Sequence, residues 1–389
     1  MVVKEHNVTE PLILSFANQT RPDEIRINVM VGTKSLGTAW FRSRTGLALV
    51  QNGNALFCLG IYPASEVGSD LIIKGAVERD LLDRAGLISG MFHSWWSGCR
   101  TVSIDAQIDE PTQFAAKGSA AAFFSGGVDS SFTLAQELEN LQGIITILGA
   151  DIPLGECEAN DQLAQVCQNV ATDLGIEPVV IETNIRDIFY PYAGWTEYHG
   201  SVLSAIGHML SERFDRVLIS ASGNEFAWDV PWGSHPQLDP LFGSTHLKVE
   251  HFGLEERVDK IARISSVDTL MRHLRVCNVS RTNCGVCEKC TFVMAALSFL
   301  SMSDKSRTFP EYDPLGGSLR VLDDAILTEF VRFGERAERE GRPDLAARIH
   351  AEISRYNRAR RLKNVFGLSN LDARLRVLKH RLRYRGLKI

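Results

Sequence analysis

The sequence predicts an α/β fold whose centre is a doubly wound parallel sheet. Within residues 116–304, short apolar segments alternate with longer amphipathic ones, which is typical of buried parallel strands joined by crossover helices. The composition fits a globular protein, because 44% of the 389 residues are apolar and 23% are charged. A chain of this length has room for two or three domains with cores of their own.

The preceding region, residues 1–115, is expected to be a β-rich domain with one helix. Turn signals rich in Gly and Asn separate its apolar segments. Four strands are expected here, at 24–32, 38–43, 55–62 and 101–106. The helix is expected within 77–96, and the polar stretch 107–119 leads into the central domain.

The elements of the central domain are expected to alternate regularly between strand and helix. Strands are predicted within 120–127, 143–152, 178–185 and 215–223. Helices are predicted within 130–140, 159–176 and 200–214. Such crossover helices cover both faces of a parallel sheet, so the strands should be buried on both sides.

Residues 305–389 are expected to form a basic helical extension. Helices are predicted at 321–340 and 345–363, and a third begins at Ser369 with a capping-box-like pattern. Residues 355–389 contain 12 Lys and Arg against one Asp, whereas the rest of the chain is acidic. Three roles remain open for this basic tail: a packed cap that pairs with the acidic body or a second subunit, a docking surface for nucleic acid or a protein partner, and a membrane-surface helix.

A Gly-rich turn lies between the first strand and the first helix of the central domain. It consists of seven consecutive residues: Ser125, Gly126, Gly127, Val128, Asp129, Ser130 and Ser131. The two glycines let backbone N–H groups approach an anion, and the helix N-terminus attracts the same charge. The serine hydroxyls can add donors, and the Asp129 carboxylate is suited to holding Mg²⁺ on phosphates. We therefore expect a phosphate site with Ser125 and Asp129 as candidate catalytic residues.

Half of the eight cysteines fall within 14 residues. They are Cys277, Cys284, Cys287 and Cys290. Zinc prefers tetrahedral sulfur ligands, and spacings of two residues let neighbouring thiolates face one ion. Four thiolates leave no open coordination position, so a zinc ion here would be structural. An iron–sulfur cluster is the alternative, since C-x2-C-x2-C also occurs in ferredoxins, and a group without a metal is the third reading.

The SGGVDSS turn at 125–131 resembles the SGGxDS loop of the PP-loop ATP pyrophosphatases, an adenine-nucleotide α-hydrolase-like superfamily with a HUP-like sheet. Together with the C-x6-CGVCEKC pattern at 277–290, it resembles 7-cyano-7-deazaguanine synthase over residues 118–303, about half of the chain. The resemblance implies that ATP with Mg²⁺ is cleaved between its α- and β-phosphates to activate a small-molecule carboxylate as an adenylate. Ammonia would then form an amide, and a second ATP a nitrile. A structural zinc ion, forming a zinc knuckle, and a homodimer are implied as well.

Polar and aromatic residues follow the last predicted strand, in the segment 221–244. Ligands of doubly wound sheets bind beyond the carboxyl ends of such strands. The candidate substrate residues here are Glu225, Trp228, Asp229, His235 and Asp239. Trp232, like Trp228, is able to stack on a flat ring. Asp151 closes the second strand of the central domain and is expected near ATP or the substrate. The alternatives are a solvated surface loop and, for Asp151, a helix-cap or turn residue.

These observations lead to three hypotheses of function. The first is a ligase or nitrile synthase that acts on a deazapurine-like carboxylate with ammonia. The second is an enzyme of the same chemistry that modifies tRNA or a protein, since synthase-like proteins with added domains occur in antiphage gene neighbourhoods. The third is a non-catalytic ATP-binding module. The sequence shows no secretory signal and no run of about 18 apolar residues, so we expect a cytoplasmic protein without a membrane span.

Overall fold

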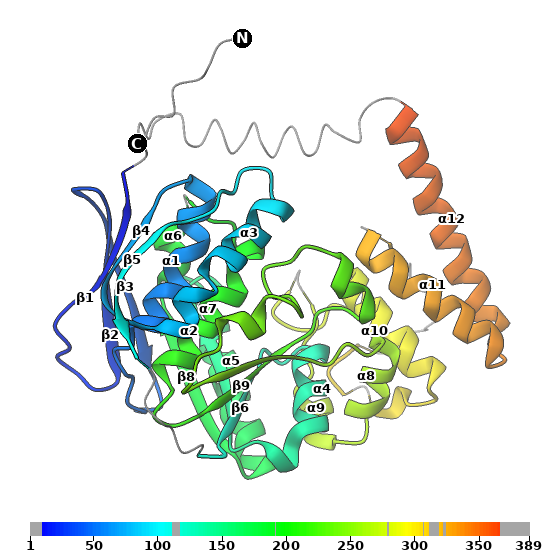
Figure 1. Ribbon diagram of the computed structural model, residues 1–389. Coiled ribbons are helices and arrows are strands. Elements are labelled where there is room, and N and C mark those ends of the chain that lie inside the picture. Colours follow the sequence, from blue (N-terminus) through cyan, green and yellow to red (C-terminus); the bar gives the residue numbers. More distant parts are fainter. Residues whose placement is uncertain are drawn as a thin grey trace.

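A single mixed sheet runs through the protein, as the computed structural model in Figure 1 shows. The structure describes residues 10–110, 117–190, 192–277, 280–305, 307–310, 319–321 and 324–365. Within these residues the sheet has ten strands in the order β10-β9-β6-β7-β8-β3-β2-β1-β4-β5. Six of the nine pairings between these described strands are parallel.

The five strands that follow residue 117 form an all-parallel half of the sheet, within the region where alternating strands and helices are predicted. Its strands are β6 (Ala120–Phe123), β7 (Gly143–Leu148), β8 (Glu177–Thr183), β9 (Arg216–Ser220) and β10 (Lys248–Phe252). The chain runs from β6 through β7 to β8 and then returns to β9 on the other side of β6. This reversal opens a crevice at the carboxyl ends of β6 and β9, the place where doubly wound sheets bind ligands.

Helices cover both faces of this half, as the alternation in the sequence predicts. They are α4 (Val128–Glu137), α5 (Cys157–Leu174), α6 (Ile185–Phe189), α7 (Trp195–Met209), α8 (Arg257–Ile264), α9 (Asp268–His273) and α10 (Glu288–Phe299). Ala121 and Phe123 of β6 share one hydrophobic core with α7, while Ala120 and Ala122 share a second core with α4, α5 and α8. Successive residues of β6 therefore point to opposite faces of the sheet and pack against different helices.

The N-terminal region extends the same sheet. Its strands are β1 (Leu12–Phe16), β2 (Glu24–Val31), β3 (Lys34–Ser43), β4 (Leu71–Glu78) and β5 (Ile104–Asp109). β3 pairs antiparallel with β8, which would otherwise be an unpaired edge. The predicted helix at 77–96 is divided into α2 (Arg79–Asp83) and α3 (Ala85–Trp95). The expected domain boundary near residue 115 lies outside the described residues.

One predicted strand is wrong. Residues 55–62 lie in α1 (Gly53–Val67), which begins where the side chain of Asn52 accepts a hydrogen bond from the Asn54 N–H. Every residue from Gly53 to Ser65 is buried, because α1 packs against the sheet and against α3 and α7. A helix that is buried on all sides carries no polar stripe, so its apolar run is mistaken for a buried strand.

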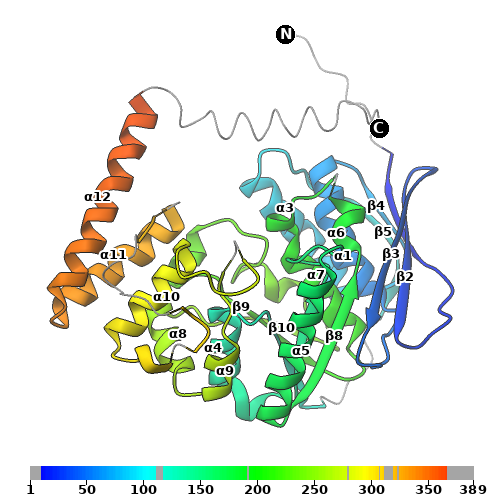
Figure 2. The ribbon, with the colours of Figure 1, turned by 180° about the vertical axis from the view of Figure 1, so that it is seen from behind.

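The C-terminal region forms a helical hairpin of α11 (Asp324–Arg339) and α12 (Pro343–Val365), on the side of the molecule opposite β1–β5 in Figures 1 and 2. Phe330 and Phe333 of α11 are buried against Phe292 and Phe299 of α10. The helix predicted from Ser369 lies outside the described residues. Across the part of the chain that the structure describes, no helix has both the length and the apolar character needed to cross a membrane.

Candidate functional site

The Gly-rich turn opens onto the crevice at the end of β6. Gly126 has a φ of +77°, a left-handed conformation that glycine adopts without strain, and Gly127 caps α4 without a side chain. The Ser130 hydroxyl accepts a hydrogen bond from the Ser125 N–H at 3.2 Å, and the Gly126 carbonyl accepts one from the Arg275 N–H at 2.8 Å. These two hydrogen bonds fix the turn next to the N-terminus of α4, where free backbone N–H groups and the helix dipole favour negative charge.

A cavity of about 610 Å³ lies in front of this turn, within the size range of small-molecule sites. Ser125, Gly127, Val128 and Asp129 form one part of its wall. Ser130 lines a smaller cavity beside it, and the hydroxyl of Ser131 is buried without a described partner. Of the three predicted serine donors, Ser125 is therefore the one that faces the larger cavity.

The carboxylate of Asp129 is held by two cations from α8. The Lys260 ammonium donates to Asp129 Oδ1 at 2.8 Å, and an Arg257 guanidinium nitrogen lies 3.7 Å from Oδ2. Burial raises the pKa of Asp129, but attraction to Lys260 and Arg257 outweighs it, so the pKa lies below its usual range. Asp129 is therefore ionised at neutral pH.

Three basic residues add positive charge to the cavity wall: Arg257, Arg275 and Lys289. Arg257 also donates to the Ser222 carbonyl at 2.8 Å, which fixes it beside the end of β9. These residues and Lys260 were not predicted from the sequence. They come from helices and a linker more than 120 residues after the turn, and no spacing pattern connects them to it.

Asp151 lines both cavities, as expected for a residue at the end of β7. Its carboxylate accepts a hydrogen bond from the Trp195 indole N–H at 2.8 Å. Trp195, His199 and Trp232 form an aromatic wall, with ring centroids 6.2 Å apart for both neighbouring pairs. Burial lowers the pKa of His199, so its imidazole is neutral at pH 7. The cavity thus combines cations near the turn with flat aromatic surfaces.

The five candidate substrate residues of 221–244 do not line the described cavities. Glu225 pairs with Arg332 of α11, whereas Trp228 and Asp229 are exposed. His235 is buried against Trp95 at a ring distance of 4.7 Å. Asp239 is fully buried and accepts hydrogen bonds from Ser234, His235 and His251. The same segment contributes Ser222 to the cavity wall, together with Trp232, whose ring was expected to be able to stack.

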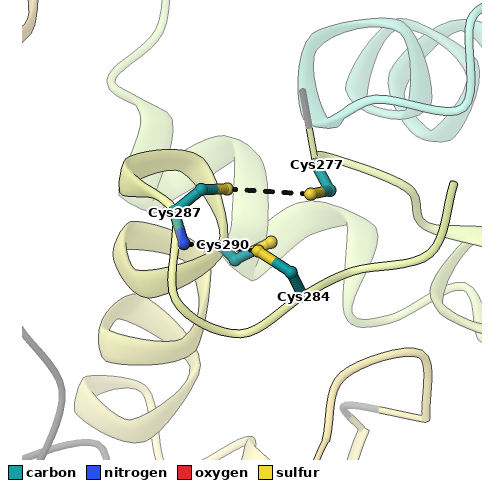
Figure 3. Close-up of side chains that lie close together, drawn as sticks. All are labelled: Cys277, Cys284, Cys287 and Cys290. Atoms are coloured by element: carbon teal, nitrogen blue, oxygen red, sulfur yellow. Dashed lines mark hydrogen bonds between the residues drawn. The ribbon is translucent and has the colours of Figure 1, made fainter. Parts of the chain in front are cut away.

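The four clustered cysteines come together in space, as Figure 3 shows. All of their sulfur atoms lie within 4.8 Å of one another, and those of Cys277 and Cys287 are 3.8 Å apart. A tetrahedral zinc ion with Zn–S bonds of about 2.3 Å needs sulfur atoms about 3.8 Å apart. An iron–sulfur cluster lies between its ligands and spreads them further, so the geometry fits a single ion better.

The surroundings of the cysteines fix this arrangement. The Asn283 side chain accepts hydrogen bonds from the N–H groups of Val276 and Cys277, and it donates to the Leu274 carbonyl. Gly285 has a φ of +72°, and a Cβ there would meet Pro310 at 2.6 Å. A metal would therefore bind to a group of four sulfur ligands that the fold has already assembled.

The cysteine group is continuous with the cavity. Val276 and Cys277 line the cavity wall, as do Lys289, Phe292 and Val293 of α10, the helix that begins directly after Cys287. A metal that holds the cysteines together would also hold this part of the wall.

Comparison of the chain with protein-family models, with curated proteins and with solved structures gave no match. What the cavity can do therefore follows from its own residues.

Proposed function

We propose that the cavity binds ATP and Mg²⁺ and that the protein is an adenylating ligase of the PP-loop pyrophosphatase type, with a carboxylate acceptor and ammonia as second substrate. The proposal is carried by the position of Asp129 in the wall of the 610 Å³ cavity. Its carboxylate is ionised, lies in the first turn of α4 and contacts the cations of Lys260 and Arg257. A carboxylate among cations at a helix N-terminus suits a site for a metal–phosphate complex better than one for a bare anion.

The phosphates of ATP would lie against the turn and the N-terminus of α4. Arg257, Arg275 and Lys289 neutralise their charge, and the backbone N–H groups at Gly127 and Val128 supply donors. The aromatic wall of Trp195 and His199 offers flat surfaces on which a heterocycle can stack. A nucleotide has this combination of a charged end and a flat end.

Asp129 would hold Mg²⁺, which neutralises the departing pyrophosphate when bound. In the structure Asp129 binds Lys260 instead, and the Lys260 ammonium also donates to the Ala221 carbonyl at 2.8 Å. Lys260 therefore keeps Asp129 ionised and in place, and it retains one partner if Asp129 turns towards a metal.

Formation of the amide has two steps. An oxygen of the acceptor carboxylate attacks the α-phosphorus, the bond between the α-phosphorus and the bridging oxygen breaks, and pyrophosphate leaves. Ammonia then attacks the activated carbonyl carbon and loses a proton, and AMP leaves with the electrons of the acyl–oxygen bond. Adenylation is needed because a carboxylate oxygen is a poor leaving group, and the cations around the turn stabilise the charge that develops on pyrophosphate. In a second round, the amide oxygen would attack the α-phosphorus of another ATP and release pyrophosphate. The carbon–oxygen bond would then break, AMP would leave and the nitrogen would lose its two protons, which gives the nitrile.

The four cysteines would hold a structural zinc ion. Their four sulfur atoms complete a tetrahedral set, so no position is left for a water or a substrate. Their part in the reaction is to keep Cys277 and α10 in the cavity wall.

The test is product analysis of ATP turnover with Mg²⁺, with ammonium and with 7-carboxy-7-deazaguanine or related aromatic carboxylates. We expect AMP and pyrophosphate, and we expect Asp129→Asn to lower AMP formation by at least about 100-fold. Asp161→Asn, the same change on the exposed face of α5, is the control and should leave the rate unchanged. ADP as the only product would exclude the proposed reaction. Binding of ATP without any turnover would favour the hypothesis of a non-catalytic ATP-binding module.

A further inference from the structure

The outer part of α12, residues 354–362, is largely exposed, although Tyr356 is half-buried against the hydrophobic core that α10 and α11 share. Seven of these nine residues are exposed, including Leu362, whose exposed fraction is 59%. The inner part of α12 packs on α11 through the buried residues Leu345, Ala346 and Ile349. Figures 1 and 2 both show the helix running away from the body beyond this contact. We call residues 354–362 the α12 arm.

The arm is strongly basic. It carries four arginines, at positions 355, 358, 360 and 361, all of them exposed. Neither Asp nor Glu occurs anywhere in residues 353–365. Arg355 bonds to Glu352, which precedes the arm. At about 1.5 Å per helical residue, the four guanidinium groups lie along about 9 Å of helix, a charge density of the same order as that of a nucleic acid duplex.

We propose that the α12 arm binds the phosphate backbone of a nucleic acid. All four cations of the arm are arginines, whose planar guanidinium groups form paired hydrogen bonds with phosphate oxygens. They are also spread around the helix, because Arg358 and Arg360 are two residues, or about 200°, apart. A polyanion with evenly spaced charges can contact such an arm from several sides, whereas an acidic patch on a folded protein would meet one face.

A membrane surface fits the arm less well. Binding in the plane of a membrane needs an apolar face, and the apolar side chains near the arm are not gathered on one side. Ile353 and Leu362 are nine residues apart, which places them on opposite sides of the helix. The arm therefore offers charge without an apolar surface that could enter a bilayer.

The arm is attached to the cavity through α11. Arg332 of α11 pairs with Glu256 at 2.9 Å, and the carboxylate of Glu329 accepts a hydrogen bond from the Arg257 N–H at 3.4 Å. Arg257 in turn lines the cavity. A nucleic acid held by the arm would thus be anchored on the side of the molecule that carries α8. This binding needs no turnover of ATP, so it can be tested independently of the proposed function.

The test is fluorescence anisotropy of the full-length protein with a labelled RNA oligonucleotide and with a DNA duplex of the same sequence. We expect a dissociation constant on the order of micromolar at physiological salt, rising steeply with salt. The variant Arg358→Gln/Arg360→Gln/Arg361→Gln should bind at least about tenfold more weakly, and the slope of log Kd against log salt should fall by about 2 to 3. Tighter binding to the RNA than to the DNA duplex would identify RNA as the preferred nucleic acid.

Matched controls distinguish binding by the arginines of the arm from a general effect of the protein's positive charge. Arg21→Gln/Arg44→Gln/Arg79→Gln removes the same number of charges from exposed arginines of the N-terminal half and should bind like the unmodified protein. Asp129→Asn should bind normally as well. Absence of binding, equal binding by the arm variant, or displacement of the RNA by polyglutamate as effectively as by unlabelled RNA would each overturn the proposal. So would arm-dependent binding to anionic lipid vesicles in place of RNA.

Discussion

The ammonium of Lys260 is shared between the Asp129 carboxylate and the Ala221 carbonyl, both at 2.8 Å, while its side chain is only 1% exposed. A buried cation is tolerated in a protein only where it has such partners. Asp129 in turn depends on Lys260 for its low pKa. At the scale of single residues, this pair connects the stability of the fold to the chemistry of the cavity.

Replacement of Asp129 should therefore lower stability in a manner that depends on pH. The folded-state pKa of Asp129 is lowered, so its contribution is present at pH 7 and is lost as the pH falls from the unfolded value through the folded one. We expect Asp129→Asn to reduce the free energy of unfolding by about 1–2 kcal/mol at pH 7 and by less at about pH 3. Urea unfolding at the two pH values checks this, and a difference that grows on acidification would contradict it.

The two glycines of the turn should respond differently to alanine. Gly126 has a φ of +77°, so Ala there strains the backbone by about 1–2 kcal/mol, although its Cβ would meet nothing closer than the His273 carbonyl at 3.7 Å. Gly127 has a φ of −80°, and its Cβ would lie 3.5 Å from the Ser125 hydroxyl, an ordinary contact. We expect Gly126→Ala to lower the melting temperature and Gly127→Ala to leave it unchanged.

Both glycine variants should nevertheless raise the KM for ATP. The Cβ of Gly127→Ala would enter the cavity wall, and the strain in Gly126→Ala would move the N–H groups of the turn. Thermal unfolding and AMP formation, measured on the same preparations, separate the two effects. Unchanged KM values in both variants would show that phosphate does not bind at this turn.

At the scale of elements, the cysteine group and α10 act as one unit. We expect about one zinc ion per chain by elemental analysis, and we expect Cys284→Ala to lower the zinc content and the free energy of unfolding by at least about 2 kcal/mol. Because Cys277 and Lys289 line the cavity, this variant should also bind ATP more weakly. Cys157→Ala, at an exposed position outside the group, is the control. Iron and visible absorption in place of zinc would contradict this assignment.

The elements that the sequence predicts well are those whose pattern is local. β6, β7, β8 and β9 are short apolar runs between amphipathic helices, and the Gly-rich turn and the cysteines follow fixed spacings. α1 is mistaken for a strand because it is buried all round, and β1, β4 and β10 were not predicted. Lys260 and Arg275 could not be found at all, since only tertiary packing brings them to Asp129 and Gly126.

At the scale of the whole molecule, two contacts join the halves of the sheet. One is the short pairing of β3 with β8, and the other is the packing of α7 against α1. β3 and β8 share three residue pairs, from Phe41↔Thr183 to Ser43↔Ile181. The packing of α7 against α1 is more extensive than the pairing of β3 with β8. Because the N-terminal end of α7 also carries Trp195 and His199, the N-terminal half supports the aromatic wall of the cavity.

Tyr198 is the residue that tests this support. It is 1% exposed, its hydroxyl donates to the Leu59 carbonyl of α1 at 2.7 Å, and its ring stacks on Tyr62. We expect Tyr198→Ala to cost about 3–5 kcal/mol of stability, and Tyr198→Phe only about 1 kcal/mol. If α7 is held by α1, Tyr198→Ala should also raise the KM for ATP under conditions where it is still folded, while Tyr198→Phe should not. A loss of stability with an unchanged KM would mean that the cavity wall keeps its shape without the contacts of Tyr198 to α1.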